Sequence, residues 1–221
     1  MYPRIKRIFM AWRSGRGHSR IIVGEIKSNA SETVFRYIKD GVKTAREEGF
    51  VCYPDFPEID KTYNTNVLRI LSQRLNDSER TDIKHYYEFW KIPKSCIRNT
   101  YRLLAYTGGI LPTDNFEFLA EFYGTKNISL VTELASLSVR KISNEELSVG
   151  DQLVWKLEPN NKYDHYAVAI YKGDKMIGYA KKIHSRIFYR KGSRLLSVMV
   201  KRIEHNGHIN KVFLQISYNR H

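Results

Sequence analysis

The stretch LSVGDQLVWKLEPNNKYDHYAVAIYKGDKMIGYAKK, residues 147–182, decides the fold of the C-terminal half of this 221-residue chain. Residues 153–157 alternate apolar and polar side chains, which is the period-2 pattern of a half-buried strand. The Pro-Asn-Asn run that follows favours a turn, because proline fixes φ and asparagine side chains bond their own backbone. Residues 167–171 and 176–179 then predict two further strands joined by a Gly-Asp turn. The stretch therefore predicts three strands and one polar corner, and it ends in the lysine pair Lys181-Lys182.

The flanking sequence supplies three more strands and one helix. A first strand is predicted over residues 128–137, and two later segments, 195–203 and 211–218, are predicted to pair as a hairpin across a Gly-containing turn. Residues 182–191 predict a short helix with its apolar side chains inward, ended by Gly192. Six short strands with one helix are typical of a small closed or partly closed barrel.

The charge of the chain points to a polyanionic partner. The formal net charge is +14, and a protein this basic usually binds a polyanion, most often nucleic acid. The alternative is an alkaline proteome or simple solubility. Residues 120–221 carry 17 Lys and Arg against 9 Asp and Glu, and residues 1–119 carry 20 against 14. Residues 181–203 hold eight basic residues and no acidic one, and a uniform solubility charge would not produce such a local patch.

The N-terminal half mixes strands and helices. Strands are predicted over residues 5–12, 20–26 and 33–37, and helices over 40–48, 67–75, 80–90 and 95–106, before the chain turns toward 116–122. Asp40 and Ser95 are the predicted caps of two of these helices, and Gly108-Gly109 is a predicted stop. We therefore expect an α+β protein with a mixed module over residues 1–119 and a small OB-like barrel over residues 120–221.

Several classes of function find little support in the sequence. Two cysteines, Cys52 and Cys96, make neither a metal site nor a disulfide framework, and His205 and His208 lack a third ligand. No Ser-His-Asp arrangement stands in a supporting motif. No apolar run is long enough to span a membrane, and the start of the chain does not read as a signal peptide. We expect a cytoplasmic protein with no enzymatic activity, cofactor or metal.

The organising stretch resembles the HIRAN domain, whose core reads G-D-x-L, then E-P-x-N-x-Y-D-x-x-A, then I-G-Y/H. The resemblance covers residues 127–218. The matching residues are Gly150, Asp151, Leu153, Glu158, Pro159, Asn161, Tyr163, Asp164, Ala167, Ile177, Gly178 and Tyr179. So many matches in the correct order are far more specific than a short motif. The resemblance implies binding of single-stranded DNA ends, and implicates Tyr163, Asp164, Tyr179 and Lys182 in holding the 3′ end.

The residues themselves predict one nucleic-acid-binding face, because aromatic rings stack on bases and cations hold phosphates. Its members are Tyr163, Asp164, Tyr179, Lys181, Lys182, Arg186, Arg190 and Lys191. The N-terminus of the helix over residues 182–191 is expected to add its dipole. Under the alternative, Tyr163 and Asp164 only support the turn, a role we expect for Asp164 in any case. The family's Arg-aromatic motif on the first strand is replaced here by residues 133–137, ELASL, which puts 3′-end specificity in question.

Residues 5–118 resemble the N-terminal subdomain of HipA-type toxin kinases, through VGE at 23–25, VFRY at 34–37, a prolyl segment and the helix LRILSQRLND. The helix end departs from the family's Leu-Leu-Pro, and the catalytic core of the kinase is absent. We therefore expect a non-catalytic nucleic-acid-binding protein, with DNA as the ligand, that acts as a sensor or adaptor in bacterial defence or toxin control. The alternative is an antitoxin-like regulatory partner of a separate HipA-type kinase.

Overall fold

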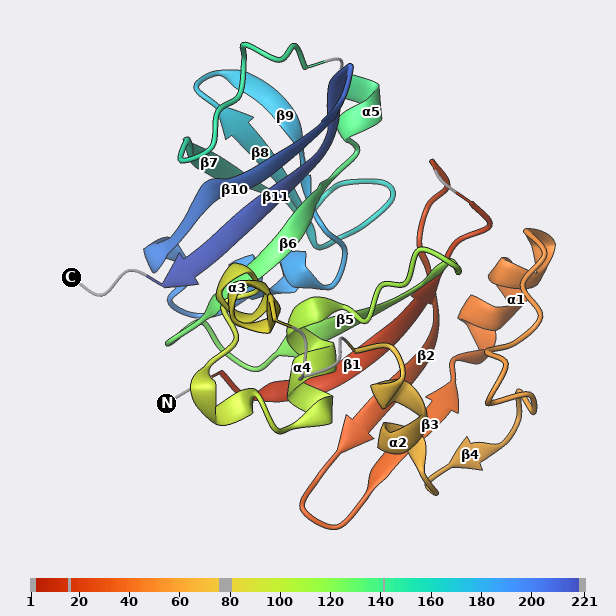
Figure 1. Ribbon diagram of the computed structural model, residues 1–221. Helices are drawn as coiled ribbons and strands as arrows, with labels where there is room; N and C mark the ends of the chain where they lie inside the picture. Colours follow the sequence, from red (N-terminus) through yellow and green to blue (C-terminus); the bar gives the residue numbers. More distant parts are fainter. Residues whose placement is uncertain (1–2, 16, 76–80, 141, 219–221) are drawn as a thin grey trace. The chain divides into compact units, whose positions relative to one another are not determined.

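The computed structural model describes residues 3–15, 17–75, 81–140 and 142–218, and it confirms the α+β class (Figure 1). The chain divides into two compact units between Glu121 and Phe122. Residues 5–121 form the N-terminal unit, and the C-terminal unit contains the rest together with Pro3 and Arg4. The predicted boundary at 119/120 lies close to this division. None of the described helices has the length and apolar character needed to cross a membrane.

The N-terminal unit is built on one sheet with the strand order β4-β3-β2-β1-β5 in the described part of the chain. Its elements are β1 (Ile5–Trp12), β2 (Ile21–Ser28), β3 (Thr33–Tyr37), α1 (Lys39–Glu47), β4 (Thr62–Tyr63), α2 (Val67–Ser72), α3 (Ile83–Phe89), the 3₁₀ helix η1 (Lys94–Cys96), α4 (Thr100–Thr107) and β5 (Phe116–Phe122). Figure 1 shows the helices α1, α2 and α4 beside the strands of this sheet.

One layer of the core of this unit is formed by aligned side chains on three strands of the sheet. Ile8, Ile26 and Phe35 stand opposite one another on β1, β2 and β3, and all three are fully buried. Because side chains alternate along a strand, the next residues along point to the other face. Phe35 stacks on Phe56 from the long connection, with ring centroids 4.6 Å apart. A Cβ at Gly41 would lie 1.8 Å from the carbonyl oxygen of Ile22, so α1 packs on β2 at a distance that excludes any larger residue.

Two predicted helix caps in this unit are wrong. The N-cap of α1 is Ile38, without a side-chain hydrogen bond, and Asp40 lies inside the first turn, where its charge complements the helix dipole. The cap of α4 is Asn99, whose Oδ1 accepts a 2.9 Å hydrogen bond from the Arg102 amide. Ser95 lies in η1 instead, since the chain makes a 3₁₀ turn before α4 begins. The predicted stop is confirmed, with Gly108 in the left-handed region at φ +73°.

Predicted helix ends in the centre of this unit also shift. The helix predicted over residues 67–75 ends at Ser72, and the helix predicted over 80–90 begins at Ile83 and ends at Phe89. Residues 76–80, which include the predicted start of the second helix at residue 80, lie outside the described residues.

The C-terminal unit is a closed antiparallel barrel with the described strand order β10-β11-β6-β9-β8-β7, which confirms the six-strand prediction. Its elements are β6 (Ser129–Ala135), α5 (Leu137–Arg140), β7 (Gln152–Glu158), β8 (Ala167–Lys172), β9 (Lys175–Ala180), the 3₁₀ helices η2 (His184–Tyr189) and η3 (Ser193–Leu195), β10 (Leu196–Asn206) and β11 (His208–Tyr218). The barrel closes where Val198 of β10 pairs with Leu153 of β7.

Aromatic and aliphatic side chains fill the barrel. Ile170, Val198 and Ile216 are buried on three of its strands. Phe188 of η2 is also fully buried, and its ring centroid lies 4.9 Å from that of Trp155 on β7. η2 therefore packs against the barrel through the apolar side chains that the sequence pattern predicted to point inward.

Three details of the predicted barrel are wrong. The segment predicted as a helix over residues 182–191 is the 3₁₀ helix η2, which follows Ile183 at a strained φ of +74°, and it offers no α-helical N-terminus for an anion. Strands β10 and β11 continue past the predicted turn, because Glu204 pairs with Lys211 across the ladder and Gly207 alone makes the reversal at φ +72°. The first strand ends at Ala135, where Ser136 at φ +62° redirects the chain into α5.

Candidate nucleic-acid interface

The corner loop, defined here as residues 158–166 between β7 and β8, is organised by one asparagine. The Asn161 Oδ1 atom accepts hydrogen bonds from the amides of Tyr163 at 3.0 Å and Asp164 at 3.3 Å. Its Nδ2 atom donates to the Glu158 carboxylate at 2.9 Å. An asparagine side chain that bonds the backbone two residues on mimics a backbone turn, so the Pro-Asn-Asn run fixes the loop as the sequence predicted.

Within the corner loop, the Asp164 side chain bonds the backbone and the Tyr163 side chain faces the solvent. The Asp164 carboxylate accepts a 2.9 Å hydrogen bond from the Tyr166 amide, and its carbonyl accepts one from the Ala167 amide. Asp164 thus supports the turn, the role expected for it in either reading of the sequence. The Tyr163 side chain is 80% exposed, and the Lys162 ammonium lies 4.8 Å from its ring centroid. Tyr163 is therefore an aromatic ring held out in solvent with a cation beside it.

Tyr179 on β9 is tied directly to the corner loop. Its hydroxyl donates a 3.1 Å hydrogen bond to the same Glu158 carboxylate that Asn161 contacts. Burial, together with the neighbouring Glu158 carboxylate, raises the pKa of the Tyr179 hydroxyl above its ordinary value. Ala135 and Ala169 stand opposite Tyr179 on the two neighbouring strands. Opposite residues share a face of the sheet, so the ring is flanked by the two smallest side chains available.

A second aromatic pair joins η2 to the corner loop. The Tyr166 and Tyr189 rings meet edge to face with centroids 5.3 Å apart, and the Tyr189 hydroxyl donates to the Ala167 carbonyl at 2.9 Å. The Arg186 guanidinium lies 5.1 Å from the Tyr166 ring centroid. Tyr166 and Tyr189 were not among the residues predicted for this face. Each of these tyrosines neighbours a predicted site residue in the sequence, in DHY at 164–166 and FYR at 188–190. Only the fold shows that the two rings meet.

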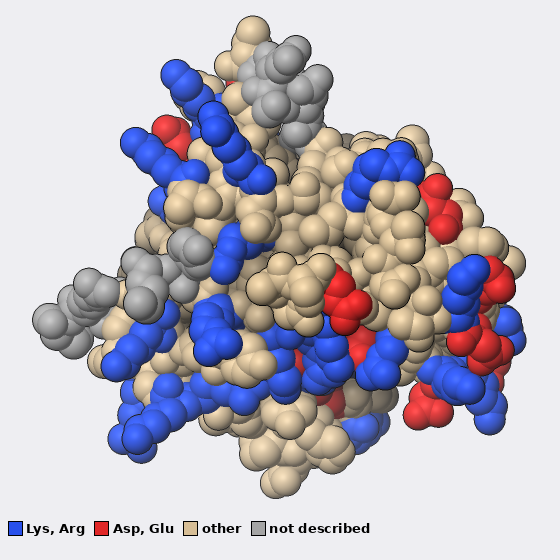
Figure 2. All heavy atoms as spheres, turned by 90° about the horizontal axis from the view of Figure 1, so that it is seen from below, with Lys and Arg blue, Asp and Glu red and all other residues tan. Residues whose placement is uncertain are grey.

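The remaining predicted cations fall into two groups. Lys182 and Lys191 are exposed at the two ends of η2, and Arg190 beside them is half-buried. Lys181 is only 4% exposed, and its ammonium lies 3.1 Å from the Glu133 carboxylate on β6. Lys181 therefore points into the protein, and its charge is matched by an acidic residue on the strand where the sequence analysis noted a missing arginine. Figure 2 shows Lys and Arg side chains widespread on the face in view, with fewer Asp and Glu among them.

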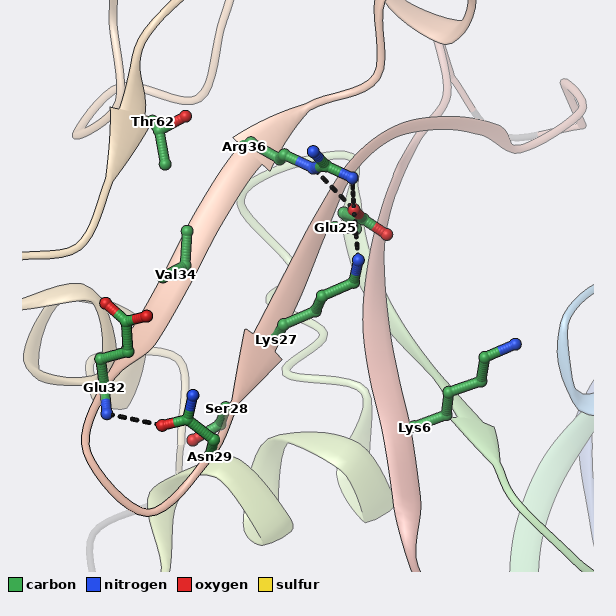
Figure 3. A pocket seen from close by; sticks show the side chains of 9 residues that line it. All are labelled: Lys6, Glu25, Lys27, Ser28, Asn29, Glu32, Val34, Arg36 and Thr62. Atoms are coloured by element: carbon green, nitrogen blue, oxygen red, sulfur yellow. Dashed lines mark hydrogen bonds and ion pairs between the residues drawn. The ribbon is translucent and has the colours of Figure 1, made fainter.

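A pocket of about 450 Å³ lies on the N-terminal unit, and Figure 3 shows it from close by. Its lining residues are Lys6, Glu25, Lys27, Ser28, Asn29, Glu32, Val34, Arg36 and Thr62. Figure 3 shows Arg36 and Lys27 converging on Glu25, at 2.5 Å and 3.3 Å. Arg7 reaches the same carboxylate at 2.7 Å. Cations that converge on a buried carboxylate are engaged within the fold, so the free cationic and aromatic groups of the corner loop are the better candidate site.

The fold and this site define a small closed β-barrel domain that exposes tyrosines and cations around one loop. Residues 128–216 match the family model of the HIRAN domain, so the barrel is a HIRAN domain, as the sequence motifs predicted. The crystal structure of the HIRAN domain of human HLTF is similar to this chain, with 17% sequence identity and a TM-score of 0.32 over 40% of this chain and 74% of that chain. No curated protein matches the chain. The resemblance of residues 5–118 to HipA-type kinases rests on sequence motifs and stays a prediction.

Proposed function

We propose that the HIRAN domain of this protein binds single-stranded nucleic acid, with DNA as the expected ligand, through the corner loop, Tyr179 and η2. The observation that carries the proposal is the pairing of exposed tyrosines with cations. Lys162 lies beside the ring of Tyr163, and Arg186 lies beside the ring of Tyr166. Bases stack on aromatic rings while basic side chains follow the phosphate backbone, which is the general recipe for binding a single strand.

The energetics of this arrangement support a strand laid along the face. Stacking on an aromatic side chain contributes about 1–3 kcal/mol per base. Tyr163 and Tyr166 provide two such rings on one loop, and both remain accessible to a ligand. The Asp164 carboxylate bonds the Tyr166 amide, so its charge is partly satisfied within the loop and repels a phosphate less than a free carboxylate does. Lys182, Arg186 and Lys191 supply positive charge at the level of η2.

We propose a binding role without catalysis. The polar groups of the face serve the fold, because Asn161 and Asp164 hold the loop and Glu158 receives the Tyr179 hydroxyl. A general acid or base needs a titratable group within reach of a reacting atom and tuned near the working pH. Binding of a single strand by this face requires aromatic rings that stack on bases and cations that contact phosphates.

The direct test is binding of a fluorescently labelled single-stranded oligonucleotide, followed by anisotropy over a range of salt concentrations. We expect binding that weakens steeply with salt, because each phosphate contact on a single strand contributes about −0.7 to the slope of log K against log salt. The double variant Lys182→Glu with Arg186→Glu is expected to abolish it. Absence of wild-type binding at low salt would refute the proposal.

Strand-end preference needs a separate experiment. A panel of single-stranded, recessed and blunt DNA, each with a free or a blocked 3′ end, separates capture of an end from binding along the strand. Because residues 133–137, ELASL, stand where the family has its Arg-aromatic motif, we propose binding along the strand, with equal affinity for free and blocked ends. A loss of affinity on blocking the 3′ end would show end capture instead. The same panel made in RNA compares the two nucleic acids.

The biological setting proposed from the sequence is bacterial defence or toxin control, with a HipA-type kinase as a possible protein partner of the N-terminal unit. Its support is the motif resemblance over residues 5–118. The quickest test is the neighbouring genes, since a kinase-like gene beside this one would favour a regulatory pair. Co-purification of the two gene products would then establish the complex, and its failure would leave the N-terminal unit without this role.

A further inference from the structure

Arg140, the last residue of α5, lies over the aromatic ring that anchors the corner loop. Its guanidinium carbon is 5.9 Å from the centroid of the Tyr179 ring. The short helix reaches this position because Ser136, at φ +62°, turns the chain out of β6 and packs α5 against β9. The arginine arrives from a helix that the sequence pattern did not predict, just after the predicted end of the first strand at residue 137.

The Arg140 guanidinium is incompletely satisfied within the protein. Its Nε atom is buried and has no hydrogen-bond partner among the described residues. Within the same residues Arg140 forms no ion pair, although other basic side chains of the unit do, such as Lys172 with Asp151. A buried donor without a partner costs free energy, and here the cost falls on the Nε atom, since the Arg140 side chain as a whole is half-buried. The arrangement is therefore one that an added anion would stabilise.

Small side chains flank the Tyr179 ring on the two neighbouring strands. Ala135 and Ala169 stand on either side of the ring, and a methyl side chain reaches little further than its own strand. The Tyr179 hydroxyl is occupied by Glu158, which in turn holds Asn161 of the corner loop. Arg140 thus stands beside the same ring that the loop is built on, and its Nε atom has no hydrogen-bond partner among the described residues.

We infer that Arg140 is a further ligand-binding residue of this face, and that its guanidinium contacts one phosphodiester group of the bound strand. Guanidinium donors match phosphate oxygens in a bidentate geometry that an ammonium cannot reproduce. The Tyr179 ring holds the Arg140 guanidinium in place, and the phosphate oxygens accept hydrogen bonds from the guanidinium. This inference rests on the proposed function of the corner-loop face and adds a phosphate contact on the α5 side of it.

The test compares Arg140→Gln, Arg140→Lys and the wild-type protein in the salt-dependent anisotropy experiment. We expect Arg140→Gln to weaken binding by about tenfold at low salt and to reduce the salt slope by about 0.7, the amount of one phosphate. Arg140→Lys should restore the slope and only part of the affinity. The control is Arg202→Gln, which removes an arginine paired with Glu204 on β10 and should change neither quantity.

The outcomes separate this inference from the proposed function. If the wild-type protein binds no nucleic acid, the proposed function and this inference both fall. If the wild-type protein binds and Arg140→Gln binds with the same affinity and slope, only the role of Arg140 falls. A lower affinity with an unchanged slope would mean that Arg140 shapes the site without contacting a phosphate, and it would also overturn the inference. Thermal melting followed by circular dichroism checks that each variant is folded.

A phosphate-replacement experiment gives an independent readout. Oligonucleotides that carry a single neutral methylphosphonate at successive positions remove one charge at a time from the strand. At the position that Arg140 contacts, the wild-type protein should lose about tenfold in affinity, while Arg140→Gln should lose nothing further. Equal losses for the two proteins at every position would contradict the contact.

Discussion

The N-terminal sheet and the corner-loop face of the barrel both carry many cations, and they differ in what those cations contact. On the sheet, Arg7 bridges the Glu25 and Glu121 carboxylates at 2.7 and 2.8 Å, and Arg36 and Lys27 add to Glu25. The two carboxylates are only 3% exposed. Around the corner loop, Lys162, Arg186 and Arg140 each lie beside a tyrosine ring.

This difference teaches that total charge does not locate a binding site. The two halves of the sequence carry similar excesses, 20 basic against 14 acidic residues in 1–119 and 17 against 9 in 120–221. A cation that neutralises a buried carboxylate stabilises the fold and has little left for a ligand. A cation on an aromatic ring keeps its hydrogen-bond donors, so it remains available to a phosphate. The partners of the charges therefore decide which surface binds.

The largest expected effect comes from reversing charge on the two surfaces in parallel. Lys182→Glu with Arg186→Glu should weaken binding to a labelled single strand by more than about a hundredfold, because two attractive contacts become repulsive. The matched control reverses two exposed lysines of α1, Lys39→Glu with Lys43→Glu, and should change affinity by less than about twofold. Anisotropy titration measures both. An equal loss in the control would mean that net charge governs binding, and it would remove the distinction between the units.

The next effect concerns stability and the sheet alone. Glu25→Gln leaves Arg7, Arg36 and Lys27 around a neutral amide in a buried position, and we expect a loss of about 2–3 kcal/mol in the free energy of unfolding. Urea denaturation followed by circular dichroism measures it. Glu58→Gln, which removes an exposed carboxylate paired with Lys61, should cost less than about 0.5 kcal/mol. Nucleic-acid affinity should stay unchanged in both variants.

The same carboxylate predicts a pH dependence. Burial alone would raise the pKa of Glu25, but hydrogen bonds from Arg7, Arg36 and Lys27 hold it at about 2, below the 4.5 of a free glutamate. Since the folded pKa is the lower one, the stabilisation is complete above about pH 4.5 and is lost as the pH falls toward 2. Between pH 4.5 and 2 the free energy of unfolding, measured by urea denaturation at each pH, should fall more in the wild type than in Glu25→Gln. An equal fall in the two proteins would contradict a lowered pKa of Glu25.

A smaller effect is expected at the exposed ring of the corner loop. Tyr163→Ala removes one stacking platform and should weaken single-strand binding by about tenfold, within the range for loss of one stacked base. Because the ring is 80% exposed, the melting temperature should stay within about 2 °C of the wild type. Tyr163→Phe keeps the ring and should bind as the wild type does. A weak Tyr163→Phe variant would show that the hydroxyl, and not the ring, makes the contact.

The smallest effect is expected from removing the Asn161 side chain, whose hydrogen bonds hold the corner loop. Asn161→Ala removes the acceptor for two amides and a donor to Glu158, and it should destabilise the C-terminal unit by about 1 kcal/mol. Asn161→Asp keeps the acceptor and should recover part of that stability. Thermal melting measures the two variants. No change in Asn161→Ala would mean that the loop is held by its other contacts.

Much of the barrel could be predicted from the sequence, because local alternation and turn chemistry specify it. All six strands and the Asn161 corner follow from patterns that a few neighbouring residues create. The site residues were harder, because their partners are distant in sequence. Arg186 meets Tyr166 only after η2 has packed on the barrel. Tyr163, Tyr179 and the cations of η2 were named from composition and resemblance, and their roles stay predictions until binding is measured.

Two residues show where the sequence reasoning stopped. Lys181 follows directly after β9, and its side chain is buried beside Glu133 of β6, a partner 48 residues away that the local sequence does not indicate. Arg140 was not predicted because the helix α5 that carries it was not predicted. The first strand was expected to run to residue 137, and Ser136, with its positive φ, follows the last strand residue, Ala135, two residues earlier. Single non-glycine residues with positive φ leave little trace in a sequence, since glycine and asparagine are the usual signals.

The closure of the barrel limits the ways in which this domain can bind a ligand. With β10 paired to β7 and β9 paired to β6, each described strand of the barrel has a neighbour on both sides, which leaves little edge onto which an extended segment could add as a further strand. Recognition by this unit must then depend on side chains and loop shape. Substitutions in the loops can change the ligand while the hydrogen-bonded frame stays the same, so the barrel and its binding surface can evolve independently.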